Sequence, residues 1–177
     1  MKSREDLADH FASLGFNKGV EVGVDGGHYS RVLAKANPNL QLKCVDPWKR
    51  RGGNMETARK TLADCPNAEL IRGYSMNVVR QFPLESLDFV YIDAAHDFDN
   101  VMMDIIEWGR RVRVGGIISG HDYSNNLRNG TEDAVNTYAK HHQLKVNVLP
   151  VSTGQFTPKS PNEDNRPTGL SWWMLKK

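Results

Sequence analysis

Two pairs of carboxylate and imidazole side chains follow apolar stretches of the 177-residue sequence and could carry out chemistry together. Asp93 precedes His96 by three residues after LDFVYI, and His121 directly precedes Asp122 after GGIISG. A carboxylate and an imidazole at such spacings can share a metal ion, or divide into a ligand and a general base. We expect Asp93, His121 and Asp122 to converge on one divalent cation. Oxygen ligands suit Mg²⁺ or Mn²⁺, whereas imidazole also admits softer ions.

Simpler structural roles compete with this interpretation. Asp93 or Asp97 can cap the helix that follows, and His96 can be an exposed residue of that helix. His121 and Asp122 can belong to a solvated loop that binds no metal. The residue types alone leave both interpretations open.

The first apolar stretch of the chain ends in a glycine-rich segment, EVGVDGGHYS at residues 21–30. Glycines allow the backbone to turn tightly and to approach a ligand, and the helix that follows presents free N–H groups. A dinucleotide fingerprint reads GxGxxG, whereas this segment reads ExGxxxG, so pyrophosphate binding is disfavoured. We predict a nucleotide or nucleoside site here. The alternative is an ordinary strand–turn–helix with a glycine at a positive φ angle.

Polar residues at two further strand ends suit a ribose-bearing ligand. Asp46 ends the second apolar stretch and is followed by Pro47 and Trp48. Both hydroxyls of a ribose can donate to one carboxylate, and an indole offers a flat face for a base or sugar. Asp46 could instead be a turn residue ahead of a proline. After the third strand, Ser75 is a candidate N-cap of the next helix, a role that does not exclude a ligand contact.

The elements that must position these residues are predicted from apolar spacing, which alternates or is continuous in strands and recurs every 3.6 residues in helices. The expected strands are Gly19–Val22, Leu40–Val45, Ala68–Arg72, Leu87–Ile92, Ile117–Ser119, Val146–Val151 and Ser171–Leu175. The expected helices are one through Leu7, Phe11 and Leu14, one carrying Tyr29, Val32, Leu33 and Ala36, and those at Met55–Ala63, Val101–Trp108 and Thr131–His142. A turn at Gly115-Gly116 is expected to precede the fifth strand.

The order of these elements predicts an α/β fold. Five strand–helix alternations imply a parallel sheet with helices on both faces. The last two strands have no helix between them, which implies an antiparallel pair at one edge, because a parallel crossover normally needs a helix. Trp172 and Trp173 alternate on the last strand, so one is expected in the core and the other on the opposite sheet face. Ligands of such sheets bind beyond the carboxyl ends of the strands, where the polar residues described above lie.

Composition restricts the class of protein. The length suits one domain, residues 1–177, with no room for a separate substrate-binding domain. Lys+Arg 23 against Asp+Glu 21 gives a net charge of +2, which is too even for a dedicated nucleic-acid binder. No apolar run approaches the roughly 18 residues of a membrane span, the N-terminus lacks a secretory signal, and two cysteines are too few for a disulfide framework. We expect a cytoplasmic protein that binds neither nucleic acid nor membrane.

In combination, these segments resemble class I S-adenosylmethionine-dependent methyltransferases. The resemblance is carried, in the expected order, by VEVGVDGGHYS, VDPW, RGYSMN, FVYIDAAHDFDNVMMDI, VGGIISGHDY and SWWMLKK. The YIDxxH…GGxxxxHDY arrangement is similar to that of macrocin-type sugar O-methyltransferases and, more distantly, of catechol O-methyltransferase. The resemblance implies one class I methyltransferase domain with a Rossmann-like, seven-stranded, mostly parallel sheet. Its strand order would be 3-2-1-4-5-7-6, with strand seven antiparallel.

The resemblance also implies where S-adenosylmethionine would bind. Glu21, Gly23 and Gly26 would form the loop beneath the methionine part of the cofactor. Asp46 would hold the ribose hydroxyls, with Trp48 nearby. These positions are the ends of the first two predicted strands.

The resemblance also implies roles for residues at the ends of the later strands. Ser75 and Met76 fall where the family contacts adenine. Asp93 would lie close to the sulfonium group and, in metal-dependent members, would ligate Mg²⁺. His96 matches a residue proposed as general base in the sugar-modifying relatives, and Asp122 matches a second metal carboxylate.

The implied function is O-methylation of a small hydroxylated substrate, with or without the help of Mg²⁺ or another divalent cation. His121 departs from the metal-dependent members, which usually have an acidic residue at this position. Two other functions stay open. The protein could be an NAD-dependent oxidoreductase, since Asp46 could hold an NAD ribose, or a non-catalytic protein that binds S-adenosylmethionine on the same fold.

The sequence does not identify the methyl acceptor. Four parts of the protein could select this acceptor: the N-terminal helix, the basic segment KRRGGN at 49–54, the segment at 152–169, or a second subunit of a homodimer. The 152–169 segment has three prolines and few apolar residues, and is long for a hairpin connection. A lid, a subunit contact and disorder are all compatible with its composition.

Overall fold

The computed structural model describes residues 1, 3–49, 55–126, 129–149 and 169–177. The main sheet consists of β1 (Lys18–Val22), β2 (Gln41–Asp46), β3 (Ala68–Arg72), β4 (Leu87–Ile92), β5 (Val112–Gly120), β8 (Asn147–Leu149) and β9 (Ser171–Leu175). The helices are α1 (Arg4–Ser13), α2 (His28–Ala36), α3 (Met55–Thr61), α4 (Ser75–Val78), the 3₁₀ turn η1 (Val79–Gln81), α5 (Phe98–Arg111) and α6 (Thr131–His142). A small hairpin of β6 (Asn125–Asn126) and β7 (Asn129–Gly130) precedes α6.

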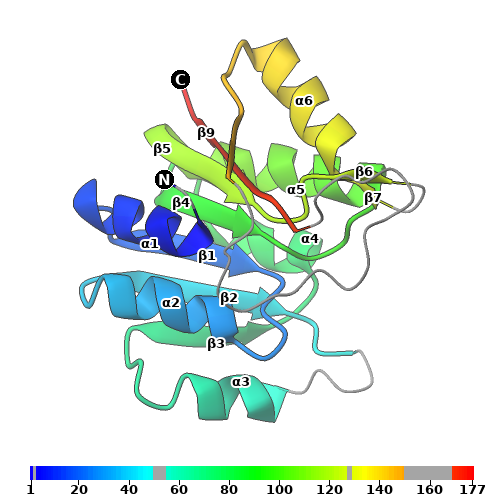
Figure 1. The fold of residues 1–177 in the computed structure, drawn as a ribbon. Coiled ribbons are helices and arrows are strands. Elements are labelled where there is room, and N and C mark those ends of the chain that lie inside the picture. The colour runs from blue at the N-terminus through cyan, green and yellow to red at the C-terminus, as the bar shows by residue number, and fades with distance from the viewer. Residues whose placement is uncertain (2, 50–54, 127–128, 150–168) are drawn as a thin grey trace.

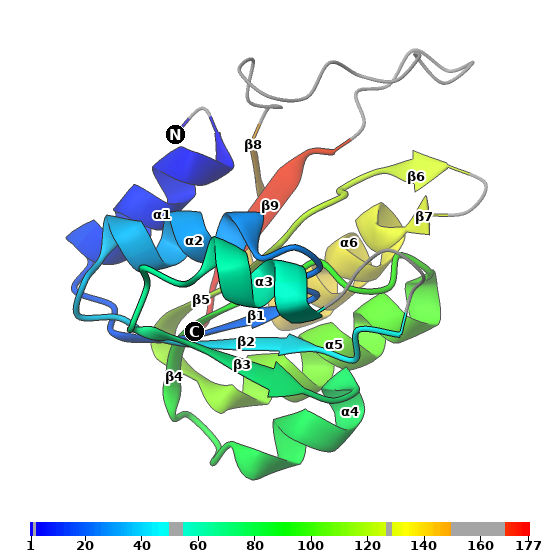
Figure 2. The ribbon, with the colours of Figure 1, turned by 90° about the horizontal axis from the view of Figure 1, so that it is seen from below.

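The sheet lies between two layers of helices, with α1, α2 and α3 on one face and α4, α5 and α6 on the other (Figure 1, Figure 2). The strand order is β3-β2-β1-β4-β5-β9-β8, which reads 3-2-1-4-5-7-6 when these seven strands are numbered along the chain. The first five strands pair in parallel, and β9 runs antiparallel to both β5 and β8. The predicted fold class is therefore confirmed, including the antiparallel last strand.

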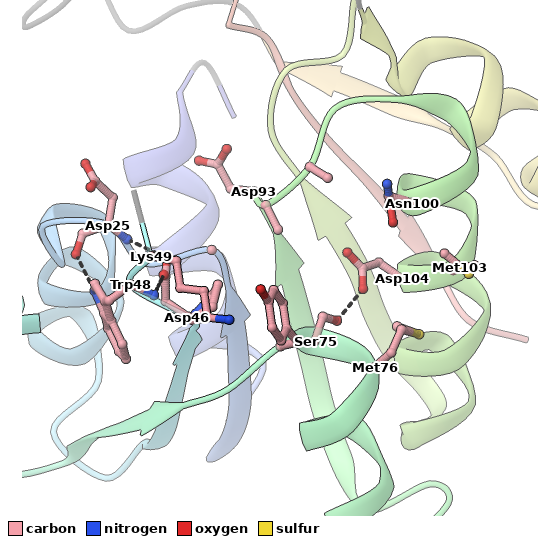
Figure 3. Close-up of a pocket in the computed structure, with 15 residues that line it drawn as sticks. Asp25, Asp46, Trp48, Lys49, Ser75, Met76, Asp93, Asn100, Met103 and Asp104 are labelled. Carbon is pink, nitrogen blue, oxygen red and sulfur yellow. Dashed lines mark hydrogen bonds between the residues drawn. The ribbon is translucent and has the colours of Figure 1, made fainter. Parts of the chain in front are cut away.

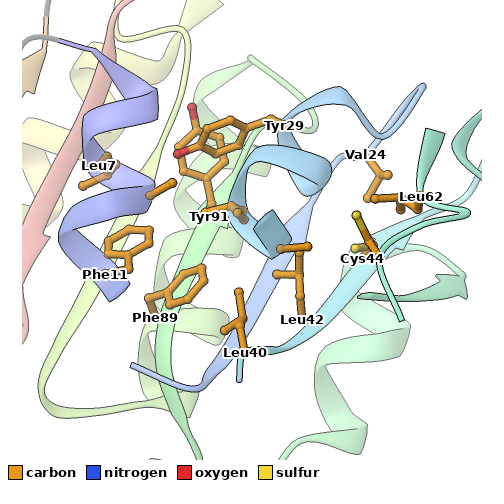
Figure 4. Packing of buried hydrophobic residues seen from close by; sticks show 14 of the residues in the cluster. Leu7, Phe11, Val24, Tyr29, Leu40, Leu42, Cys44, Leu62, Phe89 and Tyr91 are labelled. Atoms are coloured by element: carbon orange, nitrogen blue, oxygen red, sulfur yellow. The ribbon is translucent and has the colours of Figure 1, made fainter. Parts of the chain in front are cut away.

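Buried apolar side chains form one hydrophobic cluster on each face of the sheet. On the α1–α2 face, Phe11 stacks on Phe89 with ring centres 4.2 Å apart, and Tyr29 packs on Tyr91 at 4.3 Å (Figure 4). On the other face, α5 and α6 cover the sheet around the fully buried Trp108. Alternate residues of β4 serve the two clusters, because successive side chains of a strand point to opposite faces.

The two tryptophans of β9 separate as predicted. Trp172 is fully buried in the cluster beneath α5 and α6, whereas Trp173 packs against the cluster beneath α1 and α2. The prediction that one ring lies in the core and the other on the opposite sheet face is confirmed.

The predicted turn at Gly115-Gly116 is wrong, because both glycines lie inside β5. The strand begins at Val112 rather than Ile117, and its pairing with β4 shifts register between Leu87 and Phe89. Gly115 has a φ of 75°, and a Cβ on Gly116 would lie 2.4 Å from the carbonyl oxygen of residue 88. Two glycines permit a β-bulge as readily as a turn, so the pair alone does not distinguish them.

Other boundaries differ by a few residues. Helix α5 is longer at both ends than the predicted Val101–Trp108, and α3 ends at Thr61 rather than Ala63. Strand β8 covers the middle of the predicted Val146–Val151, of which 150–151 lie outside the described residues. The KRRGGN segment beyond residue 49 and the 152–169 segment up to residue 168 also lie outside them. No helix in the described ranges has the length and apolar character needed to cross a membrane.

The register of the parallel strands brings their carboxyl ends to one edge of the sheet. Val22 pairs with Val45 on one side and with Ile92 on the other, and Ile92 pairs with Gly120. The loops that follow β1, β2, β4 and β5 therefore leave the sheet side by side. This edge is where the sequence predicts the functional residues.

Candidate active site

A cavity of about 600 Å³ lies beyond the carboxyl ends of β1 to β4 (Figure 3). Of the residues predicted to bind a cofactor, its lining includes Gly23, Asp46, Trp48, Ser75, Met76 and Asp93. Helix α5 forms another wall through Asn100, Met103 and Asp104. Among the described residues, the predicted Glu21 and Gly26 do not line it. Four strand ends thus contribute to one ligand-sized space.

The glycine loop, residues 23–27, brings the end of β1 into close contact with the end of β4. Gly23 has a φ of 92°, and a Cβ at this position would lie 1.9 Å from the carbonyl oxygen of Asp93. Only glycine therefore fits there. Gly27, with a φ of 77°, is the N-cap of α2. Gly26 has no such constraint, since the nearest atom to an added Cβ is 3.4 Å away.

The carboxylate of Asp46 ties the glycine loop to the loop after β2. One oxygen accepts from the backbone N–H groups of Val24 at 2.9 Å and Asp25 at 3.1 Å, and the other accepts from the N–H of Trp48 at 2.6 Å. The Trp48 indole N–H donates to the carbonyl oxygen of Asp25 at 2.9 Å. Asp46 is thus a turn residue that also lines the cavity, and its contact with a ribose stays a prediction.

The ring of Trp48 is less available to a ligand than the sequence suggests. Trp48 is only 8% exposed and belongs to the hydrophobic cluster beneath α1 and α2. Its φ of 45° is unusual for a bulky side chain, and its two hydrogen bonds hold it there.

Ser75 is not the N-cap of α4, which corrects that prediction. The N-cap is Tyr74, with no side-chain capping bond, and Ser75 is the first helical residue. The Ser75 hydroxyl donates to the Oδ1 atom of Asp104 (Figure 3). It also accepts from the indole N–H of Trp108 at 2.8 Å. Both hydrogen-bond partners of the hydroxyl therefore lie on α5, far away in the sequence. No local sequence pattern indicates these two hydrogen bonds.

Asp93, His96, His121 and Asp122 meet at the ends of β4 and β5 and are called the acid–histidine cluster below. Nε2 of His96 lies 3.1 Å from Oδ2 of Asp122 and 3.6 Å from Oδ1 of Asp93. Nδ1 of His121 lies 3.3 Å from Oδ1 of Asp122 and 4.0 Å from Oδ2 of Asp93. Both predicted pairs therefore come together in one group, with each imidazole facing both carboxylates.

The surroundings of Asp122 favour its ionised form. Burial alone would raise its pKa, but the hydrogen bond and charge of His121, with the charges of His96 and Arg4, outweigh burial and lower the pKa. Asp97 takes the capping role at α5, since its side chain accepts from the N–H of Asn100 at 3.1 Å. The alternative role of Asp93 as a helix cap is therefore excluded.

The donor atoms of the acid–histidine cluster fit one divalent cation. One ligand atom from each of Asp93, His96 and Asp122 lies within 4.8 Å of the others. His121, the third ligand expected from the sequence, stands beside this trio, next to the same two carboxylates. Two carboxylates with two imidazoles suit Mn²⁺ or a softer ion as well as Mg²⁺.

Glu21 lies beneath the glycine loop and is buried rather than open to the cavity. It is 2% exposed, and its carboxyl accepts a hydrogen bond from the Ser30 hydroxyl on α2. Burial raises the pKa of Glu21 to about 8, with the Ser30 hydrogen bond acting in the opposite direction. The carboxyl is therefore mainly protonated at neutral pH.

Sequence reasoning missed the part of the lining that α5 supplies. Asp104 lies between Val101, Ile105 and Trp108 on the face of α5 that packs against the sheet, and it is 4% exposed. A carboxylate at the i, i+3, i+4, i+7 spacing of an apolar helix face is a readable signal of a buried acid. The Lys49–Tyr74 pair was also missed; the Lys49 ammonium lies 4.6 Å from the ring centre of Tyr74 at the cavity wall.

Comparison with solved structures shows a shared fold. An O-methyltransferase from Bacillus cereus in complex with SAH has a TM-score of 0.67 and 16% identity, covering 98% of this chain and 80% of that chain. The O-methyltransferase TomG from Streptomyces achromogenes, involved in tomaymycin synthesis and in complex with SAM, has a TM-score of 0.69 and 15% identity, with the same coverage of 98% and 80%. An rRNA methylase from Streptococcus thermophilus has a TM-score of 0.66 and 15% identity, covering 96% and 94%.

At these identities the likeness shows the fold alone, and no curated protein matches the sequence. The family is shown by a different comparison. A family model described as a methyltransferase domain matches residues 20–123, which is more than half of the chain and includes every strand end that borders the cavity. The protein belongs to this methyltransferase domain family.

Proposed function

We propose that the protein transfers the methyl group of S-adenosylmethionine to a hydroxyl group of a small molecule. The observation that carries the proposal is the single cavity that joins the glycine loop, Asp46 and α4 and reaches Asp93 of the acid–histidine cluster. Its volume of about 600 Å³ is typical of pockets for ligands of this size. One end suits a nucleoside, and the other suits the activation of a hydroxyl group.

In this proposal the cofactor lies along the cavity with its ribose at Asp46 and its adenine at Ser75 and Met76. Asp46 already accepts three backbone hydrogen bonds, and two carboxylate oxygens offer about four acceptor sites. A ribose hydroxyl would therefore add to the existing network rather than replace it. The methionine part would lie at the glycine loop, with the sulfonium group near Asp93.

Methyl transfer is one in-line displacement, in which the S–CH₃ bond breaks as an O–CH₃ bond forms and the acceptor hydroxyl loses its proton. Catalysis therefore requires a positioned acceptor and a destination for that proton. We assign the proton to His96, because Asp122 lies 3.1 Å from its Nε2 and favours the imidazolium that forms. Asp93, at 3.6 Å from the same nitrogen, adds to this effect.

A divalent cation at the acid–histidine cluster is a second way to activate the hydroxyl, since a bound metal lowers the pKa of the hydroxyl directly. Asp93, His96 and Asp122 would hold the ion, with His121 as a further ligand. A His96 nitrogen that ligates the ion cannot also accept the proton. The two routes therefore give different results when the metal is removed.

Isothermal titration calorimetry with S-adenosylhomocysteine, S-adenosylmethionine and NAD⁺ tests the cofactor. We expect both S-adenosyl ligands to bind and NAD⁺ not to bind. Asp46→Asn keeps the size of the side chain but loses the charge, and should weaken binding about tenfold or more, since hydrogen bonds to charged groups are the stronger ones. Asp9→Asn, at an exposed position of α1, is the control. Unchanged affinity in Asp46→Asn would contradict the ribose assignment.

Mass spectrometry of reactions with hydroxylated small molecules tests the reaction. Sugars come first, because the sequence resembles macrocin-type sugar O-methyltransferases. His96→Ala and Asp93→Asn should still bind S-adenosylhomocysteine but lose turnover by about 100-fold or more. Loss of activity with EDTA that Mg²⁺ or Mn²⁺ restores supports the metal route, and unchanged activity supports His96 alone. Methylation of ribosomal RNA and of no small molecule would overturn the acceptor class.

A further inference from the structure

Asp104 is a buried carboxyl that faces the cavity from α5, although no step of the proposed reaction uses it. It is 4% exposed and lines the cavity beside Met76 and Met103 (Figure 3). Among the described residues, no Lys, Arg or His lies within salt-bridge distance of it, and only its Oδ1 atom has a hydrogen-bond partner. A carboxylate in such surroundings requires a further donor, because an unpaired buried acceptor is costly.

Ser75 and Trp108 hold Asp104 in one orientation. The indole N–H of Trp108 occupies a lone pair of the Ser75 oxygen, so the hydroxyl hydrogen is directed to Oδ1 of Asp104. The Oδ2 atom is left without a described partner. Burial raises the pKa of Asp104 to about 6, with the Ser75 hydrogen bond acting in the opposite direction. The group is therefore an ionised acceptor at pH 8.

The walls beside Asp104 define the kind of donor that fits. Met76 and Met103 present thioether side chains, which pack well against a flat aromatic ring. A ring that packs on either thioether could turn its edge toward the carboxylate. A matching ligand is a planar base with an N–H donor on its edge, as in the 6-amino group of a purine.

We infer that Asp104 accepts a hydrogen bond from the 6-amino group of the cofactor's adenine, so that the cavity selects adenine over 6-oxopurine bases. This inference rests on the proposed function, since it assumes that S-adenosylmethionine occupies the cavity. A 6-oxo group would place an oxygen acceptor against the carboxylate, where neither atom supplies a hydrogen. The 6-oxo analogue would therefore offer Asp104 no donor at the 6-position, and its N1–H could reach the carboxylate only if the base moved from the position of adenine.

The test is calorimetric titration of S-adenosylhomocysteine and S-inosylhomocysteine at pH 8. These two ligands differ at the 6-position of the base and in the hydrogen that the 6-oxo base carries on N1. We expect wild-type protein to prefer the adenine ligand by about 100-fold or more, because a site built around an N–H donor rejects an analogue that lacks it. In Asp104→Asn, whose amide can both donate and accept, the preference should fall below about tenfold. Asp99→Asn, the same change at an exposed position of α5, should keep the wild-type preference.

Each outcome decides the inference. Equal binding of the two ligands by wild-type protein, or an unchanged preference in Asp104→Asn, would overturn it while leaving the proposed function intact. Failure of wild-type protein to bind either ligand would overturn the proposed function, and this inference with it. The wild-type comparison does not depend on the folding of a variant, and far-ultraviolet circular dichroism verifies Asp104→Asn.

Discussion

Two carboxyl–serine pairs lie on opposite faces of the central sheet, and they differ in what surrounds them. Glu21 of β1 accepts from Ser30 of α2 beneath the glycine loop, in a fully enclosed position. Asp104 of α5 accepts from Ser75 of α4, and its carboxyl borders the cavity. Glu21 is 2% exposed and Asp104 is 4% exposed, so the extent of burial does not distinguish the two residues.

The difference shows in which form of each acid is stable at neutral pH. Burial raises the pKa of Glu21 to about 8 and that of Asp104 to about 6. Glu21 therefore keeps its proton and serves as a neutral part of the core, whereas Asp104 is mainly ionised and can accept a hydrogen bond from a ligand. A buried acid is a structural group when it is sealed and a candidate binding group when a cavity reaches it.

The largest expected effect comes from removing the sealed acid. Glu21→Ala leaves a void in the core and removes the carboxyl partner of the Ser30 hydroxyl, and should lower the free energy of unfolding by about 3 kcal/mol. Asp104→Ala should cost about 1 kcal/mol or less, because water can enter from the cavity and a buried charge is removed. Urea denaturation at pH 7 measures both values. A larger loss in Asp104→Ala than in Glu21→Ala would contradict the comparison.

The pH dependence of stability should separate the two acids. Because each pKa is higher in the folded state, stability is highest below the unfolded value and is lost as the pH rises through the folded value. The pH range over which this stability is lost runs from about 4.5 to about 8 for Glu21, and from about 3.8 to about 6 for Asp104. Between pH 6 and pH 8 Glu21 should therefore account for a loss of about 2 kcal/mol.

Urea denaturation across that range, with Glu21→Gln and Asp104→Asn beside the wild type, tests this assignment. Glu21→Gln should remove the loss between pH 6 and pH 8, and Asp104→Asn should retain most of it. If Asp104→Asn abolished the dependence above pH 6 instead, the two acids would have been assigned the wrong way round.

The smallest expected effect is on ligand affinity, through the two serines. Ser75→Ala removes the donor that orients Asp104 and should weaken S-adenosylhomocysteine binding by about fivefold, equivalent to about 1 kcal/mol. Ser30→Ala deletes the same group on the sealed side and should change the affinity by less than about twofold. Calorimetry at pH 8 compares them. Equal losses of affinity in the two variants would show that the enclosed pair also shapes the cavity.

Much of the candidate site could be predicted because its residues lie at the ends of parallel strands. Asp46, Asp93 and Asp122 each follow an apolar strand, and parallel pairing brings those ends to one edge without any knowledge of side-chain contacts. Asp104 was not predicted, because it enters the cavity from the middle of a helix. The role of Ser75 was misjudged because a hydroxyl can serve a nearby backbone group or a distant side chain, and only packing selects between them.

The sequence by itself determined a parallel sheet with an antiparallel pair at one edge, and the end of the sheet at which the candidate acidic and imidazole residues gather. These features depend on the period of apolar residues and on the lengths of connections, which are local properties of the chain. The tertiary structure alone decided that Glu21 is sealed while Asp104 is open to the cavity. Solvent access and the effective dielectric at a carboxyl depend on residues far apart in the chain, so no local pattern encodes them.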